Sequence, residues 1–180
     1  MTELDFAILD WIQDVFSCAA LDFLMPAVTA LGNGGAIWIA AGLALLVSKH
    51  WRREGAYLLL ALVVGYLLCN LMIKPLVARP RPCWLRPKFT LLIPVPQDFS
   101  FPSGHTVSSF AGAAVLYRTN RKFGWVAFPL AAAIAVSRLY LYVHFPSDVA
   151  VGAAAGLLFG IAVPYFAERL RSRRRKPRGV

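Results

Sequence analysis

The chain has 180 residues, of which 58% are hydrophobic, and it carries a formal net charge of +10. A mean hydropathy of +0.59 excludes a soluble globular domain with a charged surface. The charge does not indicate nucleic-acid binding, because seven of the nineteen Lys and Arg residues crowd into the last segment, 169–180. We therefore expect one membrane-embedded domain over 1–180 without a nucleic-acid partner.

The N-terminal segment 1–20 has an amphipathic, acidic pattern. Apolar residues are interspersed with Asp5, Asp10 and Asp14, which is typical of a helix lying along the membrane interface or beginning the first crossing, and no separate signal peptide is expected. Two shorter apolar stretches, 21–31 and 36–48, follow and are divided by the turn signal "GNGG". Each is short for a full crossing, so the first can instead continue the amphipathic helix.

Longer apolar segments then follow at 54–75, 103–118, 123–143 and 147–168. A helix rises about 1.5 Å per residue, so a run of about 20 residues crosses a hydrocarbon layer of about 30 Å. We predict an all-α integral membrane bundle of about six transmembrane helices, with 169–180 as a basic cytoplasmic tail.

The basic residues predict an orientation. The loops 48–54 and 117–122, together with the tail, hold thirteen of the nineteen Lys and Arg residues, which favours the cytoplasmic side for all three. In a six-helix layout both termini are then cytoplasmic. The other six basic residues fall at the outer end against the usual bias, and they are Lys74, Arg79, Arg81, Arg86, Lys88 and Arg138.

Two histidine-containing stretches are predicted at the same outer end. In "FPSGHT" (101–106), Pro and Ser favour a helix start, whose free N–H groups and positive dipole end can bind phosphate. In "HFPSD" (144–148), His144 precedes a helix start and Asp148 lies in its first turn, so the carboxylate can orient the imidazole. Taken singly, an ordinary helix start and a structural polar contact also explain these stretches.

Basic side chains near membrane depth are costly, so they normally face a polar cavity. Two histidines and one carboxylate among several cations lack the ligand set of a zinc or magnesium site, but they fit a cradle for a phosphate group. This combination favours phosphoryl transfer from an ester or anhydride to histidine and then to water.

Three motifs carry a specific family resemblance. They are Lys74 followed after six residues by Arg81-Pro82; Pro102-Ser103-Gly104-His105; and Ser137-Arg138, five residues, His144, three residues and Asp148. In order and spacing they resemble the signature of the type-2 phosphatidic acid phosphatase superfamily, which includes membrane lipid phosphatases.

The resemblance implies a role for each motif residue. His144 attacks phosphorus and forms a phosphohistidine, Asp148 orients it, and His105 protonates the leaving oxygen and later helps to activate water. The implied phosphate ligands are Lys74, Arg81, Ser103, Gly104 and Arg138. No metal or other cofactor and no obligate protein partner are implied.

The implied substrate is a membrane lipid phosphate. The inferred outer-face site favours hydrolysis of undecaprenyl diphosphate to undecaprenyl phosphate. Phosphatidylglycerophosphate, phosphatidic acid and diacylglycerol diphosphate remain open as alternatives. A non-catalytic lipid-phosphate transporter is a minor alternative, since a binder needs the cations but no nucleophile, and a purely structural membrane scaffold is the third.

Overall fold

The computed structural model describes residues 2–175, and this part of the chain is helical without a strand. In chain order the elements are α1 (Thr2–Phe16), α2 (Ala19–Leu31), the 3-10 turn η1 (Asn33–Gly35), α3 (Ala36–Val47), α4 (Arg52–Gly65), the π-helical η2 (Tyr66–Ile73), α5 (Lys74–Val77), α6 (Pro82–Leu85), α7 (Gly104–Thr119), α8 (Arg121–Tyr140) and α9 (Pro146–Arg175). The all-α prediction is confirmed.

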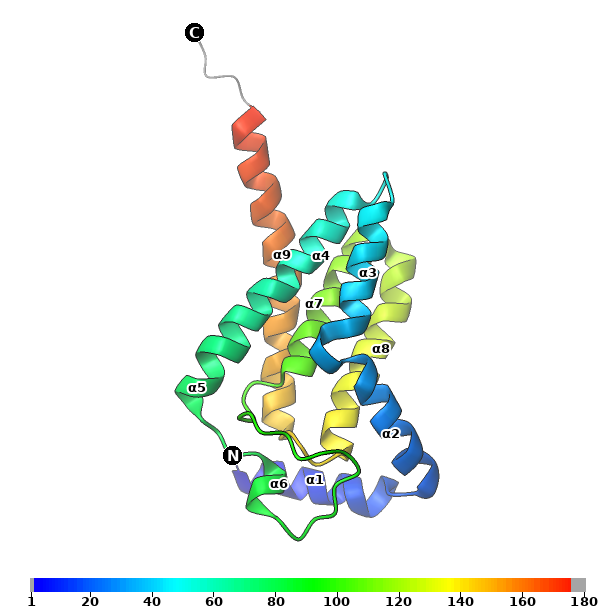
Figure 1. Cartoon of the computed structure of the whole chain (residues 1–180), viewed down its shortest axis with the longest axis vertical. Helices are drawn as coiled ribbons and strands as arrows, with labels where there is room; N and C mark the ends of the chain where they lie inside the picture. Colours follow the sequence, from blue (N-terminus) through cyan, green and yellow to red (C-terminus); the bar gives the residue numbers. More distant parts are fainter. Residues whose placement is uncertain (1, 176–180) are drawn as a thin grey trace.

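Helix α7 is the centre of the bundle and packs against α4, α8 and α9 (Figure 1). The contact with α9 is close because glycines face it: a Cβ atom at Gly156 would lie 2.4 Å from the carbonyl oxygen of Val107, and one at Gly160 would lie 2.7 Å from that of Ala111. Small residues let helix backbones approach in this way. The approach brings the N-terminal ends of α7 and α9 together at one end of the bundle.

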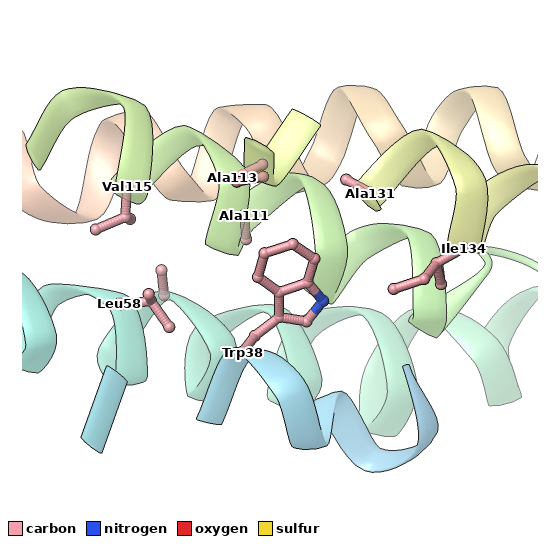
Figure 2. Packing of buried hydrophobic residues seen from close by; sticks show 9 residues of the cluster. Trp38, Leu58, Ala111, Ala113, Val115, Ala131 and Ile134 are labelled. Atoms are coloured by element: carbon pink, nitrogen blue, oxygen red, sulfur yellow. The ribbon is translucent and has the colours of Figure 1, made fainter. Parts of the chain in front are cut away.

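Trp38 of α3 is the largest side chain of the buried core and points toward α7 and α8, beside Ala111 and Ile134 (Figure 2). Its indole Nε1 donates a hydrogen bond of 3.0 Å to Oγ of Ser109, so the polar edge of this aromatic residue is satisfied. The core holds α3, α4, α7 and α8 in fixed positions around the site.

In residues 2–175, three helices are long and apolar enough to cross a membrane: Arg52–Leu85, Arg121–Tyr140 and Pro146–Arg173. A fourth span is formed if the bent pair Ala19–Leu31 and Asn33–Val47, with an angle of 42°, counts as one. The length and apolar composition of these helices fit a membrane protein. The predicted number of six transmembrane helices stays a prediction. Residues 176–180 of the predicted tail lie outside the described residues.

Helix α1 lies across one end of the bundle (Figure 1). Cys18 has extended backbone angles, so α2 does not continue α1. The apolar face of α1 packs through Phe6 and Leu9 against Tyr142 and Phe145.

The position of α1 bears on the expected cytoplasmic placement of both termini, which stays a prediction. Asp5 of α1 contacts Ser147 at the start of α9, and α9 then runs to the opposite end of the bundle. Within residues 2–175, α1 and the last turn of α9 therefore lie at opposite ends of the bundle. The physical reason is that the aspartates of α1 find partners in the loops at the site end, so α1 caps the bundle instead of crossing it.

Candidate active site

Three cations come together from separate elements. Lys74 begins α5, Arg81 precedes α6, and Arg138 lies in the last turn of α8, and their relative exposures are only 5%, 2% and 4%. They line a cavity of about 680 Å³ together with Gly104, His105 and His144. Buried cations need compensating charge, so this cluster is suited to hold an anion.

Arg138 is the least satisfied of the three. Its Nη1 donates a hydrogen bond of 2.6 Å to Oγ1 of Thr29, from α2. Among the described residues, its Nε is the buried side-chain polar atom for which no hydrogen-bond partner is present. A buried guanidinium N–H without an acceptor is costly, and a phosphate oxygen in the cavity would relieve that cost.

His144 lies in the short connection between α8 and α9 and is almost fully buried. Nη1 of Arg81 lies 3.1 Å from its Nε2, and because a guanidinium only donates, Nε2 accepts and the ring proton resides on Nδ1. Burial, together with the charges of Arg81, Arg138 and Lys74, lowers the pKa of His144 well below its usual 6.5. The imidazole is therefore neutral, with its lone pair on Nε2.

Asp148 lies behind the imidazole and is fully buried in the first turn of α9. Its Oδ2 is 3.6 Å from Nδ1 of His144. The same oxygen accepts hydrogen bonds from Oγ of Ser100 at 2.5 Å and from the backbone N–H of Phe145 at 2.9 Å. The structure thus brings the predicted histidine and aspartate together, with Ser100 beside both.

The N-terminus of α7 places its predicted residues differently. Gly104 and His105 line the cavity, and Nε2 of His105 lies 2.9 Å from Oδ1 of Asn33, in the "GNGG" turn. Ser103 does not line it, because its Oγ caps the helix by accepting hydrogen bonds from the N–H and the hydroxyl of Thr106. The structure therefore does not bring the Ser103 hydroxyl to the other predicted phosphate ligands.

Sequence reasoning missed Asp98, which precedes "FSFPSGHT". Its carboxylate accepts hydrogen bonds from Nζ of Lys74 and, at 2.7 Å, from Nη2 of Arg81. Although burial acts to raise it, the hydrogen bond from Lys74 and the charges of Arg81 and Lys74 lower the pKa of Asp98 to about 2. Asp98 is therefore ionised and competes with any anion for these two cations.

Other supporting residues were also missed, and they are Thr29, Asn33 and Ser100, whereas Arg79 was expected at the outer end but was given no role. Asn33 carried only a turn signal and Thr29 lay in an apolar stretch, so neither had a motif to mark it. In the part of the chain that the structure describes, no group of three or more His, Cys, Asp or Glu side chains is arranged to hold a metal ion.

A buried cation cluster beside an oriented, neutral imidazole in a helical membrane protein is chemically suited to phosphoryl transfer. The chain belongs to the PAP2 superfamily, whose family model matches residues 54–172. This confirms the resemblance drawn from the three motifs. Members of this family are lipid phosphatases, so the chain is an enzyme of that hydrolase class.

Known proteins extend the likeness beyond the motifs. The undecaprenyl-diphosphatase of Sulfolobus acidocaldarius is 32% identical over 156 residues, which are 86% of this chain and 72% of that protein. The crystal structure of the PAP2-type phosphatidylglycerolphosphate phosphatase from Bacillus subtilis has a TM-score of 0.77 at 26% identity, covering 93% of this chain and 86% of that one. Aquifex aeolicus LpxE gives 0.79 at 29% identity, covering 90% and 95%.

Proposed function

We propose that the protein removes the terminal phosphate of undecaprenyl diphosphate through a phosphohistidine on His144. The observation that carries this proposal is the pairing of a buried cluster of three cations, which Asp98 neutralises only in part, with the Nε2 lone pair of His144 in one cavity. A carrier that only binds lipid phosphate needs the cations but no oriented nucleophile.

The positions of the groups support the following reaction. The substrate phosphate binds Lys74, Arg81 and Arg138, which takes Nη1 of Arg81 away from His144 and frees the Nε2 lone pair. Nε2 attacks phosphorus while the bond to the leaving oxygen breaks, and His105 gives that oxygen a proton. Asp148 stabilises the positive charge that develops on the imidazole.

The second half of the reaction restores the enzyme. Water attacks phosphorus, the P–N bond breaks, and inorganic phosphate leaves with the three cations as its last contacts. His105 takes the proton of the attacking water, which returns it to the state in which it began. No step needs a metal ion or another cofactor.

The cavity wall supports a lipid substrate. Beside its charged residues, the cavity is lined by apolar residues of α2, α4 and η2, among them Pro26, Leu62 and Tyr66. The undecaprenyl-diphosphatase relative supports the diphosphate as substrate. The second candidate is phosphatidylglycerophosphate, which the likeness to the Bacillus subtilis phosphatase favours.

We further propose that the site faces the extracytoplasmic side of the cell membrane. The basic loops 48–54 and 117–122 lie at the end of the bundle away from α1 and the site (Figure 1), and α9 ends there in a run of arginines. In this orientation the C-terminus is cytoplasmic, and α1 lies at the outer face.

Phosphate release by the purified protein in detergent tests the proposal. Undecaprenyl diphosphate and phosphatidylglycerophosphate are offered side by side in the presence of EDTA, with His144→Ala as the blank. We expect release that depends on His144, and the ratio of kcat/KM values assigns the substrate. Full activity in a folded His144→Ala variant would refute the mechanism. Movement of lipid phosphate across vesicles without release of inorganic phosphate would support a transporter.

A further inference from the structure

Arg79 is the basic residue of "KPLVARPRP" that the family motif does not use. Its Nη1 lies 2.5 Å from Oδ1 of Asp148 and 2.7 Å from Oγ of Ser147, and its Nη2 lies 2.7 Å from Oδ2 of Asp5. The guanidinium also stacks over the ring of Phe145, 4.1 Å from its centroid. One planar group thus joins α1, the loop that carries His144 and the first turn of α9.

Arg79 does not line the cavity with the substrate-binding cations, so any effect on the reaction must pass through Asp148. Asp148 uses one oxygen, Oδ2, toward His144 and the other, Oδ1, toward Arg79. Nη1 of Arg79 alone contacts Asp148, while Nη2 of the same rigid, planar guanidinium is held by Asp5, so the position from which Nη1 binds Oδ1 is set. Together with Ser100 and the backbone N–H of Phe145, which bind Oδ2, Arg79 therefore fixes the face that Asp148 presents to the imidazole.

Asp5 holds Arg79 in turn and is itself only 4% exposed. Its Oδ1 accepts the backbone N–H of Ser147 at 3.1 Å, and its Oδ2 accepts the Ser147 hydroxyl at 2.8 Å. Asp5 thereby caps the start of α9, two residues from Asp148. Its negative charge also offsets that of Arg79, so that Asp148 keeps its attraction for the imidazolium formed in the reaction.

We propose that Arg79 and Asp5 are positioning residues of the phosphatase reaction, with Asp5 of α1 holding Arg79 and Arg79 holding Asp148 against His144. The inference rests on the proposed histidine mechanism. It gives the N-terminal helix, which carries no family motif, a role in turnover. Neither residue contacts the phosphate, so the binding of substrate should not depend on them.

The chain offers a matched control on the same helix. Asp10 of α1 pairs with Arg86 at 2.5 Å, with side chains 43% and 44% exposed, and it also contacts the Tyr142 hydroxyl. This pair joins α1 to the same region of the chain without touching Asp148. Its removal therefore tests the loss of an α1 ion pair alone.

The experiment compares Arg79→Gln, Asp5→Asn, their double variant and Arg79→Lys with Asp10→Asn/Arg86→Gln. We measure kcat, KM and the rate of phosphohistidine formation on the preferred lipid. A small misplacement of a reacting group can cost about 100-fold, so we expect Arg79→Gln and Asp5→Asn to lower kcat by about that factor with KM unchanged. The double variant should fall no further than either single one, and Arg79→Lys should recover part of the loss.

The control pair should stay within about twofold of the wild type, since exposed ion pairs contribute little. Near-normal kcat in Asp5→Asn and Arg79→Gln, beside His144-dependent turnover in the wild type, would overturn this inference alone. So would an equal loss in the control pair, or a rise in KM that matches the fall in kcat. If Arg79→Gln does not fold, Arg79→Lys and Asp5→Asn decide. Absence of His144-dependent turnover in the wild type would overturn the proposed function and this inference together.

Discussion

Asp98 and Arg81 form an ion pair at the edge of the cation cluster, with Oδ1 of Asp98 2.7 Å from Nη2 of Arg81. The Asp98 side chain is 55% exposed, whereas that of Arg81 is 2% exposed. The carboxylate therefore reaches into the site from the loop before α7 and neutralises part of the charge that a phosphate would bind.

Asp98→Asn should strengthen the binding of oxyanions. Without the competing carboxylate, we expect the inhibition constant of orthovanadate to fall by about fivefold, which corresponds to about 1 kcal/mol, the upper end for a partly exposed pair. Titration of activity with vanadate measures it, and Asp14→Asn on α1 is the charge-matched control. Weaker inhibition in Asp98→Asn would instead mean that Asp98 holds Lys74 and Arg81 in place for the substrate.

The low pKa of Asp98 adds a pH criterion to the same variant. Because the pKa is lowered to about 2 from 3.8, the carboxylate pairs fully above pH 3.8 and is released only as the pH falls through about 2. The ratio of the vanadate inhibition constants of the wild type and Asp98→Asn should therefore stay constant between pH 5 and 8. A ratio that converges toward unity as the pH falls to 5 would contradict the assigned ionisation.

Thr29→Val should weaken substrate binding more than turnover. The change removes the acceptor for Nη1 of Arg138, whose Nε already lacks a partner among the described residues. A hydrogen bond to a charged group contributes about 1.5–3 kcal/mol, so we expect KM to rise by about tenfold or more. Thr29→Ser keeps the hydroxyl and should behave as the wild type. An unchanged KM in Thr29→Val would show that Arg138 is held by its helix alone.

Gly156→Val should separate α7 from α9. The new Cβ atom would lie 2.4 Å from the carbonyl oxygen of Val107 and 2.9 Å from Cβ of Phe110. Overpacking of this kind costs about 1–3 kcal/mol, so we expect a lower thermal unfolding temperature in detergent together with lost activity. Ala154→Val, at an exposed position of the same helix, is the control. Equal effects in both variants would point to helix propensity and not to the close contact.

Local spacing allowed much of the site to be predicted from the sequence. Four residues across Pro146 were enough to bring His144 and Asp148 together, and the cations were marked by their cost in an apolar chain. The supporting contacts could not be predicted in the same way. Ser100 and Arg79 reach Asp148 across 48 and 69 residues, and only the tertiary fold determines such pairs.

The fold, too, could be predicted from the sequence only in part. The length of the apolar segments predicted where the long helices lie, because a helix needs about 20 apolar residues to cross a bilayer. It did not predict that α1 caps the bundle, since an amphipathic helix can lie in the interface or begin a crossing with the same pattern. The choice depends on Asp5 and Asp10 meeting Arg79 and Arg86, which the sequence alone does not place.

The protonation of His144 gives the last prediction. Burial, with the charges of Arg81, Arg138, Lys74 and His105 facing it, lowers its pKa well below 6.5, while Asp148 on α9 faces it from the other side. In ¹⁵N-histidine NMR of the protein in detergent, the His144 signals should therefore titrate below pH 6.5. Their loss in His144→Gln assigns them among the three histidines.

The same shift makes stability depend on pH in a defined direction. Below pH 6.5 the unfolded chain binds a proton at His144 that the folded protein does not yet bind, so the free energy of unfolding should decrease as the pH falls from 6.5. His144→Gln cannot bind that proton and should lose less stability over the same range. If the His144 signals titrate at or above 6.5, the imidazole is protonated at neutral pH in part of the molecules, and Nε2 is not the free nucleophile that the proposed reaction requires.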